Sequence, residues 1–164
     1  MIPTPIETDR LVIRPFVATD IERMTEIFTD PVVMKYISLR GYTIPDLFEM
    51  YARRYEERGY TFWALCDQEE RLLGDVGFGT YEETGEPEVG WTLARDSWGN
   101  GFATEAGRAC IEALFEHTPH DRIVALVDIR NERSLRTAER IGLRRVGEVA
   151  HPWHLHALFE ETRP

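Results

Sequence analysis

A strand–helix–strand pattern in the second half of the chain limits the folds open to this sequence. Glu88–Leu93 is predicted to be a strand, and Ala103–His117 carries apolar residues at the spacing of an amphipathic helix. The next segment, Arg122–Val127, has the continuous apolar character of a strand that is buried on both faces. This unit requires a sheet with a helix packed against it, which places the chain in the α/β class.

The remaining sequence adds short elements on both sides of this unit. Thr43 and Asp46 have the spacing of a capping box, which predicts a helix that begins there and runs to Arg58. The predicted order is β α α β β β α β α β β. The other predicted elements are a strand near Leu11–Phe16, a helix over Ile21–Phe28, strands at Thr61–Cys66 and Leu72–Phe78, a helix at Asn131–Ile141, and a closing antiparallel pair at Arg144–Ala150 and Trp153–Glu160. The 164 residues, 43% of them hydrophobic, can bury one core of ordinary size, so we expect a single domain spanning residues 1–164.

The segment Trp98-Gly99-Asn100-Gly101-Phe102-Ala103-Thr104-Glu105-Ala106, between the strand and the helix, is predicted to bind an anion. The first turn of a helix has backbone N–H groups without intrahelical partners, and glycine lets a phosphate approach the main chain closely. A lone glycine pair more often only shapes a turn. A Walker loop is excluded because no Lys-Ser or Lys-Thr follows, and a dinucleotide fingerprint fails because Thr104 stands at its third glycine position.

Several segments together resemble the GNAT superfamily of N-acetyltransferases, in the branch of RimJ/RimL-like protein N-terminal acetyltransferases. These segments are Glu7-Thr8-Asp9-Arg10-Leu11-Val12-Ile13-Arg14-Pro15, Leu73-Gly74 to Phe78-Gly79, Glu88-Val89-Gly90-Trp91 and the loop Trp98–Ala106. The resemblance covers nearly the whole chain. It implies a mixed, mostly antiparallel sheet of about seven strands that splays around acetyl-coenzyme A, with helices on both sides.

The resemblance also assigns cofactor-binding residues. Gly101-Phe102-Ala103 takes the glycine part of the family's pyrophosphate motif, and Trp98 replaces the leading Gln or Arg. Asn131-x-x-Ser134, leading to Ile141-Gly142-Leu143, resembles the next helix of the family, whose Asn contacts the pantetheine arm. Arg133, Arg136 and Arg140 follow on that helix and could pair with phosphates or form a solvated face, and Arg95 is a similar candidate. The expected cofactor contacts are Trp91, Thr92, Leu93, Trp98, Gly99, Asn100, Gly101, Phe102, Ala103, Thr104, Asn131 and Arg136.

Acetylation of an amine requires a proton acceptor. A lysine amine has a reference pKa of about 10.4 and a chain-terminal amine one of about 8, so both are mostly protonated near neutral pH. A carboxylate in a partly dry cleft can accept this proton because desolvation raises its pKa. We expect Glu88 to be this base, with Glu148 or His151 as substitutes; alternatively, Glu88 is an exposed carboxylate on an acidic turn.

The leaving thiolate calls for a nearby hydroxyl group. In many relatives a tyrosine on the helix after Asn131 supplies it, but the motif places Ala138 at that position. Ser134 is the nearest replacement, although a serine early in a helix is more often a cap. The absent tyrosine also leaves room for a second class of function, a non-catalytic acyl-coenzyme A sensor. A nucleotide-binding module is a weaker third hypothesis.

Charge and composition limit the partners. The net charge of −10 disfavours nucleic acid and phospholipid surfaces and tolerates a cationic acceptor. The acceptor could be a protein N-terminal amine, a polyamine or an aminoglycoside, and the protein a monomer or a homodimer. His151, His154 and His156 lack supporting Cys or acidic ligands, so we expect no metal. The sequence contains no signal peptide or apolar stretch of bilayer length, which favours a cytoplasmic location.

Overall fold

The fold is an α/β arrangement built around one mixed sheet. The computed structural model describes residues 1–151 and 154–164, and these form eight strands in the order β1-β2-β3-β4-β5-β6-β8-β7. Every neighbouring pair is antiparallel except β5 and β6, which are parallel. The strands are β1 (Ile6–Glu7), β2 (Leu11–Arg14), β3 (Phe62–Asp67), β4 (Leu72–Thr80), β5 (Pro87–Leu93), β6 (Arg122–Asp128), β7 (Arg144–His151) and β8 (His154–Thr162). The predicted fold class is confirmed, with one short strand, β1, added before the first predicted strand.

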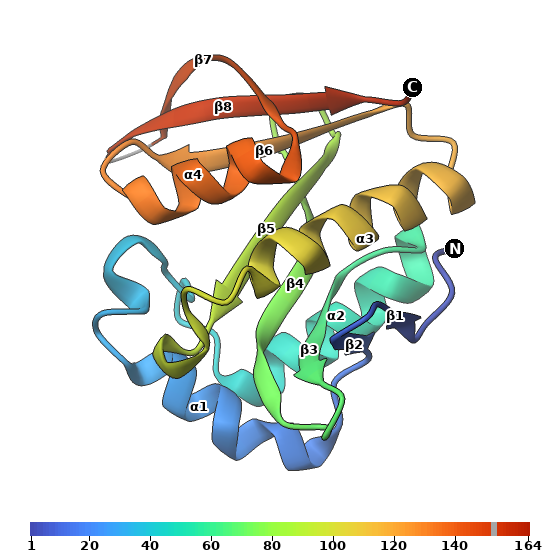
Figure 1. Cartoon of the computed structure of the whole chain (residues 1–164), viewed down its shortest axis with the longest axis vertical. Coiled ribbons are helices and arrows are strands. Elements are labelled where there is room, and N and C mark those ends of the chain that lie inside the picture. The colour runs from blue at the N-terminus through green and yellow to red at the C-terminus, as the bar shows by residue number, and fades with distance from the viewer. Residues whose placement is uncertain (152–153) are drawn as a thin grey trace.

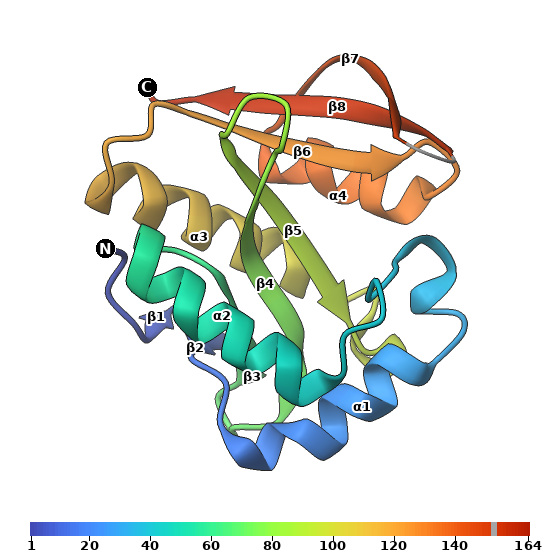
Figure 2. The ribbon, with the colours of Figure 1, turned by 180° about the vertical axis from the view of Figure 1, so that it is seen from behind.

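Helices cover both faces of this sheet. Within the described ranges the α-helices are α1 (Ile21–Thr29), α2 (Ile44–Arg58), α3 (Phe102–His117) and α4 (Glu132–Ile141). Helices α1 and α2 lie on one face, whereas α3 and α4 lie on the other (Figures 1 and 2). The capping box at the start of α2 is present: the Thr43 hydroxyl accepts from the Asp46 N–H, and the Asp46 carboxylate accepts from the Thr43 N–H.

Each face of the sheet has its own core, and the buried apolar residues of β5 belong to the core on the side of α3 and α4. Val89 and Leu93 are buried in the cluster that includes α3 and α4. Because side chains alternate along a strand, Glu88 and Thr92 point to the opposite face, where α1 and α2 pack. The candidate base Glu88 and the apolar core residues of β5 thus lie on opposite faces of the sheet.

The sheet splays between β5 and β6. β4 and β5 are paired continuously from Gly74 against Leu93 to Thr80 against Pro87. In contrast, the described residues pair β5 with β6 at one position, Glu88 against Val124. Figure 1 shows the two strands fanning apart beyond this point toward their carboxyl ends.

The splay leaves backbone groups of β5 facing the gap. In the antiparallel ladder with β4, alternate residues of β5 bond across to β4, and Ala94 continues this series by donating to the Leu73 carbonyl. Trp91 and Leu93 occupy the intervening positions, so their N–H and C=O groups point toward β6. The gap is therefore lined by a strand edge that does not pair with the described residues of β6.

The carboxyl-terminal hairpin completes the sheet in a crossed order. β8 pairs with β6 along its length, and β7 pairs only with β8 at the edge. The predicted closing antiparallel pair is confirmed, although the predicted first residue of the second strand, Trp153, lies outside the described residues. Among the helices of the described segments, none is long and apolar enough to cross a membrane.

Candidate active site

A cavity of about 600 Å³ opens where β5 and β6 diverge. Its walls come from the carboxyl end of β5, the loop before α3, the first turn of α3, one side of α4 along most of its length, and the segment 32–37 between α1 and α2. The lining residues are Val32, Val33, Lys35, Tyr36, Ile37, Trp91, Thr92, Leu93, Ser97, Trp98, Gly99, Gly101, Phe102, Ala103, Thr104, Arg130, Asn131, Glu132, Arg133, Ser134, Arg136, Thr137 and Arg140. The cavity thus joins elements that are far apart in the sequence.

The loop before α3 exposes backbone donors to this cavity. Gly99 and Gly101 have φ values of 81° and 77°, a left-handed conformation that costs other residues roughly 1–2 kcal/mol. Gly101 is the N-cap of α3, and no side chain of the described residues caps the helix. The N–H groups of the first turn, over Phe102–Thr104, therefore remain available to an anion.

Asn100 holds the shape of this loop and lies outside the cavity lining. Its Nδ2 donates to the backbone carbonyls of Ser97 and Trp98, at 3.2 Å in both cases. Its side-chain amide is thus used within the loop, and the contact of Asn100 with a cofactor stays a prediction.

Trp98 supports the floor of the cavity. Its indole Nε1 donates to the Leu93 carbonyl over 2.9 Å, which ties the loop to the end of β5. The guanidinium carbon of Arg133 lies 3.4 Å from the centroid of the Trp98 ring, within cation–π range. The tryptophan thus links β5 and α4 at a position where the pyrophosphate motif normally has Gln or Arg.

The start of α4 is capped by Asn131, because its side-chain oxygen accepts from the Ser134 N–H over 3.3 Å. The cap of this helix is therefore Asn131 and not Ser134. Ser134 is half-buried and lines the cavity. Ala138 is fully buried in the core below α4, at the position where the resemblance places a tyrosine in many relatives.

The cavity is electropositive, although the chain as a whole is acidic. Among the described residues that line it, five are basic, Lys35, Arg130, Arg133, Arg136 and Arg140, and one, Glu132, is acidic. Glu132 accepts from Arg136 over 3.3 Å on the exposed side of α4. Such a local excess of positive charge suits a polyanionic ligand.

Glu88 lies on β5 beyond the closed end of this cavity. The residue is half-buried, and burial raises the pKa of its carboxyl to about 7. The charge of Arg40 opposes this rise, whereas that of Glu82 adds to it. A carboxyl with a pKa of about 7 is suited to exchange protons near neutral pH.

The comparisons with known proteins agree with this geometry. Residues 10–144 match the family model described as the acetyltransferase (GNAT) domain. The chain belongs to the GNAT acetyltransferase family. An uncharacterized N-acetyltransferase of Bacillus subtilis, YnaD, is 31% identical over 142 residues, which cover 87% of this chain and 84% of that protein. The protein is therefore an acyltransferase.

Two solved acetyltransferase structures share the fold at low sequence identity. The ribosomal-protein-S5-alanine acetyltransferase of Vibrio fischeri superposes with a TM-score of 0.77 at 18% identity, covering 98% of this chain and 97% of that one. The spermidine N-acetyltransferase of Vibrio cholerae, in complex with CoA and spermine, also has a TM-score of 0.77, at 15% identity, covering 95% and 97%.

The structure gathers most of the sequence-predicted binding residues of this GNAT chain around the one cavity. Trp91, Thr92, Leu93, Trp98, Gly99, Gly101, Phe102, Ala103, Thr104, Asn131, Ser134 and Arg136 all line it. Asn100 and Glu88 are absent from this lining: the Asn100 side chain bonds within the loop, and Glu88 lies where β5 pairs with β6.

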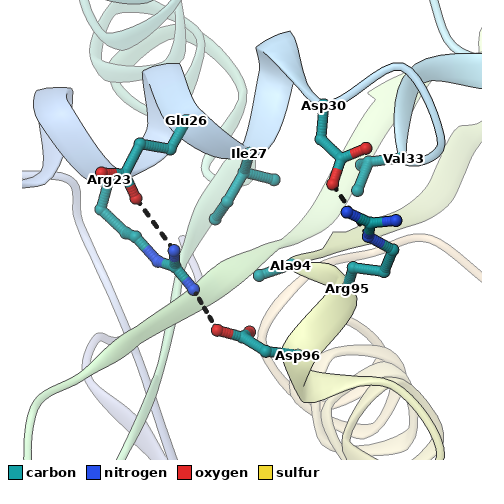
Figure 3. Close-up of a pocket in the computed structure, with 8 residues that line it drawn as sticks. All are labelled: Arg23, Glu26, Ile27, Asp30, Val33, Ala94, Arg95 and Asp96. Carbon is teal, nitrogen blue, oxygen red and sulfur yellow. Dashed lines mark hydrogen bonds and ion pairs between the residues drawn. The ribbon is translucent and has the colours of Figure 1, made fainter.

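Arg95, a candidate phosphate ligand from the sequence, lies in a different and smaller pocket of about 280 Å³ between α1 and the loop after β5. There its guanidinium pairs with Asp30 at 3.1 Å, and Arg23 bridges Glu26 and Asp96 at 2.9 and 2.8 Å (Figure 3). The Arg95–Asp30 and Arg23–Asp96 pairs connect the segment after β5 to α1 and its carboxyl end.

Sequence reasoning assigned no role to Val32, Val33, Lys35, Ile37 and Arg130, which also line the cavity. The Tyr36 hydroxyl donates to the Arg130 carbonyl over 3.1 Å, joining the α1–α2 connection to the start of α4. No periodic pattern marks a connecting loop, so the basic character of Lys35 was the one available signal.

The alternative bases Glu148 and His151 stay predictions. Glu148 is exposed and pairs with Arg145 at 2.6 Å, and the side chain of His151 lies outside the described residues. Within the described part of the chain, no group of three His, Cys, Asp or Glu side chains is arranged to hold a metal ion.

Proposed function

We propose that the protein transfers the acetyl group of acetyl-coenzyme A to a primary amine. The observation that carries this proposal is the electropositive cavity at the β5–β6 splay, bordered by the uncapped start of α3. A diphosphate would be bound by the N–H groups of Phe102–Thr104, and the basic side chains of α4 would offset the remaining phosphate charge. The V. cholerae relative binds CoA and spermine, which supports both the donor and an amine acceptor.

The pantetheine arm would lie along the open edge of β5. Its amide groups match the unpaired N–H and C=O groups of Trp91 and the N–H of Leu93, in the manner of an added strand. Asn131, at the start of α4, borders the other side of the same gap. This arrangement directs the thioester toward the closed end of the splay, where Glu88 lies.

Glu88 is proposed to accept the proton of the attacking amine, directly or through a water molecule. Half-burial keeps the pKa of Glu88 close to 7. Near neutral pH a large fraction of the carboxyl is therefore ionised and can accept a proton from the amine. Backbone N–H groups at the β5 edge would stabilise negative charge on the thioester oxygen. Ser134 is proposed to donate a proton to the leaving thiolate, in place of the hydroxyl that Ala138 lacks.

The test of this mechanism is the pH profile of Glu88→Gln. In the wild type, kcat should rise as pH increases through about 7, because the ionised carboxyl is the active form. The variant should lose about 100-fold in kcat at pH 8 and should not show this rise. Thiol release from acetyl-coenzyme A with an amine acceptor provides the assay.

Glu82→Gln is the matched control. It removes a neighbouring charge that raises the pKa of Glu88, so the wild-type profile should shift to lower pH with kcat at its plateau retained. Equal profiles for the wild type and Glu88→Gln would exclude Glu88 as the base.

The acceptor is proposed to be a protein N-terminal amine, in keeping with the RimJ/RimL-like motifs. The two solved relatives have the same fold, yet one is named for a ribosomal protein and the other for spermidine, so the fold does not select the acceptor. Mass spectrometry of a panel of amines, containing N-terminal peptides, polyamines and aminoglycosides, would identify the molecule that gains an acetyl group.

A further inference from the structure

The segment Thr8–Leu11 carries part of the family resemblance but has no role in the proposed chemistry, and it contacts the anion-binding loop from outside the cavity. We propose that Arg10 is a positioning residue that holds the Asn100–Gly101 peptide in the orientation needed to bind the diphosphate of coenzyme A. This inference rests on the proposed function, because it concerns how the loop is prepared for that ligand.

Arg10 is anchored by Glu105 in the first turn of α3. Its Nε donates to the Glu105 Oε2 over 2.7 Å, its Nη2 lies 2.5 Å from the same oxygen, and its backbone N–H donates to Oε1 over 3.2 Å. The Thr8 hydroxyl also donates to Oε1, over 2.6 Å. Burial disfavours the ionised Glu105, but the hydrogen bonds from Thr8 and Arg10 outweigh it and lower the pKa of that carboxyl. The guanidinium is therefore held in one place by a permanent charge.

From this anchored position Arg10 binds the loop itself. Its Nη1 donates to the Asn100 carbonyl over 3.0 Å, and its guanidinium carbon lies 4.8 Å from the centroid of the Phe102 ring. In a planar trans peptide the C=O and the following N–H point in opposite directions. Because Arg10 holds the Asn100 carbonyl, the Gly101 N–H points away from Arg10, and Gly101 lines the cavity.

The loop needs such a restraint because glycines flank Asn100 on both sides. Glycine has a wide choice of backbone conformations, so the Asn100–Gly101 peptide can turn over at little steric cost. A reversed peptide would direct a carbonyl oxygen toward the phosphates and repel them. Arg10 favours the orientation that binds, which reduces the free energy needed to order the loop when the ligand arrives.

The positive charge of Arg10 is a weaker explanation for its role than its hydrogen-bonding geometry. Arg10 is outside the cavity lining, and Glu105 neutralises its charge at close range. A lysine at position 10 would keep the charge, but it lacks the planar fork that reaches Glu105 and the Asn100 carbonyl at the same time. Arg10→Lys therefore separates geometry from charge.

The experiment measures the Kd of coenzyme A by titration calorimetry for the wild type, Arg10→Lys and Arg10→Met. Arg53→Lys is the matched control, because Arg53 is an exposed residue of α2 in an ion pair with Glu57. Both Arg10 variants should raise the Kd by about tenfold, and Arg53→Lys should leave it unchanged. In turnover, the loss should appear in the KM for acetyl-coenzyme A rather than in kcat. Hydrogen exchange of the Gly101 amide in the unligated protein should be faster in Arg10→Lys.

The outcomes distinguish this inference from the proposed function. If the wild type does not bind coenzyme A, the proposed function fails and this inference fails with it. If the wild type binds and Arg10→Lys binds equally well, the positioning role is wrong while the proposed function stands. A fall in kcat together with a lower melting temperature without ligand would show a general structural role and would also overturn the positioning role.

Discussion

The two ends of the β5–β6 junction use their polar groups in opposite ways. At the closed end, Arg122 donates from Nη1 to Glu86 at 2.7 and 2.9 Å and from Nε and Nη2 to Glu160 at 3.0 and 2.8 Å. These bonds join the β4–β5 turn, β6 and β8. At the open end, the β5 edge, the first turn of α3 and the basic side chains of α4 face a cavity. The polar groups of the closed end bond to one another, whereas those of the open end border a cavity, where we propose that a ligand binds.

Asp75 adds to this contrast. It lies on β4 opposite Thr92, which lines the open end, and is only 2% exposed. Its Oδ1 has no hydrogen-bond partner among the described residues. Burial raises the pKa of Asp75 to about 7, although hydrogen bonding to Thr92 opposes the shift. The comparison of the two ends indicates that polar groups are paired where the sheet closes, which stabilises the fold. Where the sheet opens, a buried carboxylate with an unpartnered oxygen lowers the stability.

Arg122→Met tests the closed end and should have the largest effect. The substitution leaves the largely buried carboxylates of Glu86 and Glu160 without their shared partner, so the free energy of unfolding should fall by about 3 kcal/mol. Urea titration measures this loss, and the Kd of coenzyme A should stay close to the wild-type value. Arg144→Met is the control, since Arg144 also pairs with Glu160 but is 74% exposed and should cost about 0.5 kcal/mol. Equal losses in the two variants would contradict a special role for the closed end.

Asp75→Asn tests the cost of the open end. Between its ordinary pKa of 3.8 and about 7, the folded state binds more protons than the unfolded state, so stability falls as pH rises across this range. The variant removes this loss, so it should be more stable than the wild type at pH 8, with a smaller gain at pH 5.

Asp128 is the control for Asp75, because its pKa is shifted in the opposite direction. Hydrogen bonds from Arg130 lower the pKa of Asp128 to about 2, so its contribution to stability is present at neutral pH and is lost only as pH falls from about 4 toward 2. Asp128→Asn should therefore destabilise the protein at both pH 5 and pH 8. An unchanged pH dependence of unfolding in Asp75→Asn would show that Asp75 is ionised in the folded state.

A pair of glycines gives the finest comparison. Gly101 at the open end and Gly85 in the β4–β5 turn have φ values of 77° and 78°, and a Cβ would meet an Arg10 nitrogen at 3.7 Å in the first and nothing within 4 Å in the second. Alanine at either position should cost about 1 kcal/mol in stability. Only Gly101→Ala should also weaken coenzyme A binding, by about fivefold, because Gly101 borders the proposed diphosphate site. Calorimetry measures the affinity of both variants, and thermal unfolding measures their stability. An equal loss of affinity in both would show that the loop is not part of the binding site.

Much of the fold could be predicted from the sequence because its signals are local. The apolar stripe of α3, the buried run of β6 and the capping box of α2 each lie within one element, and the glycines before α3 mark its start. The family resemblance added the splay of the sheet. Most of the expected binding residues line one cavity, because they lie on elements that this fold brings together.

The remaining features depend on contacts between distant residues. The two strands of the last hairpin have similar patterns, so the sequence did not indicate which one pairs with β6. The hydrogen bond of Arg10 to Asn100 and that of Tyr36 to Arg130 each join residues at least 90 positions apart. Asp75 resembles an ordinary polar residue of a strand, and its burial becomes visible only when α2 is packed against the sheet. The roles of Glu88 and Ser134 stay predictions.

The position of β8 bears on how the protein is made. This strand is synthesised after every other strand of the sheet, yet it lies between β6 and β7. While the nascent chain emerges from the ribosome, β6 therefore presents an unpaired edge, and β7 has no neighbour to bind. The sheet can therefore be completed only once residues through Thr162 are available to pair, which makes its closure a late step of folding.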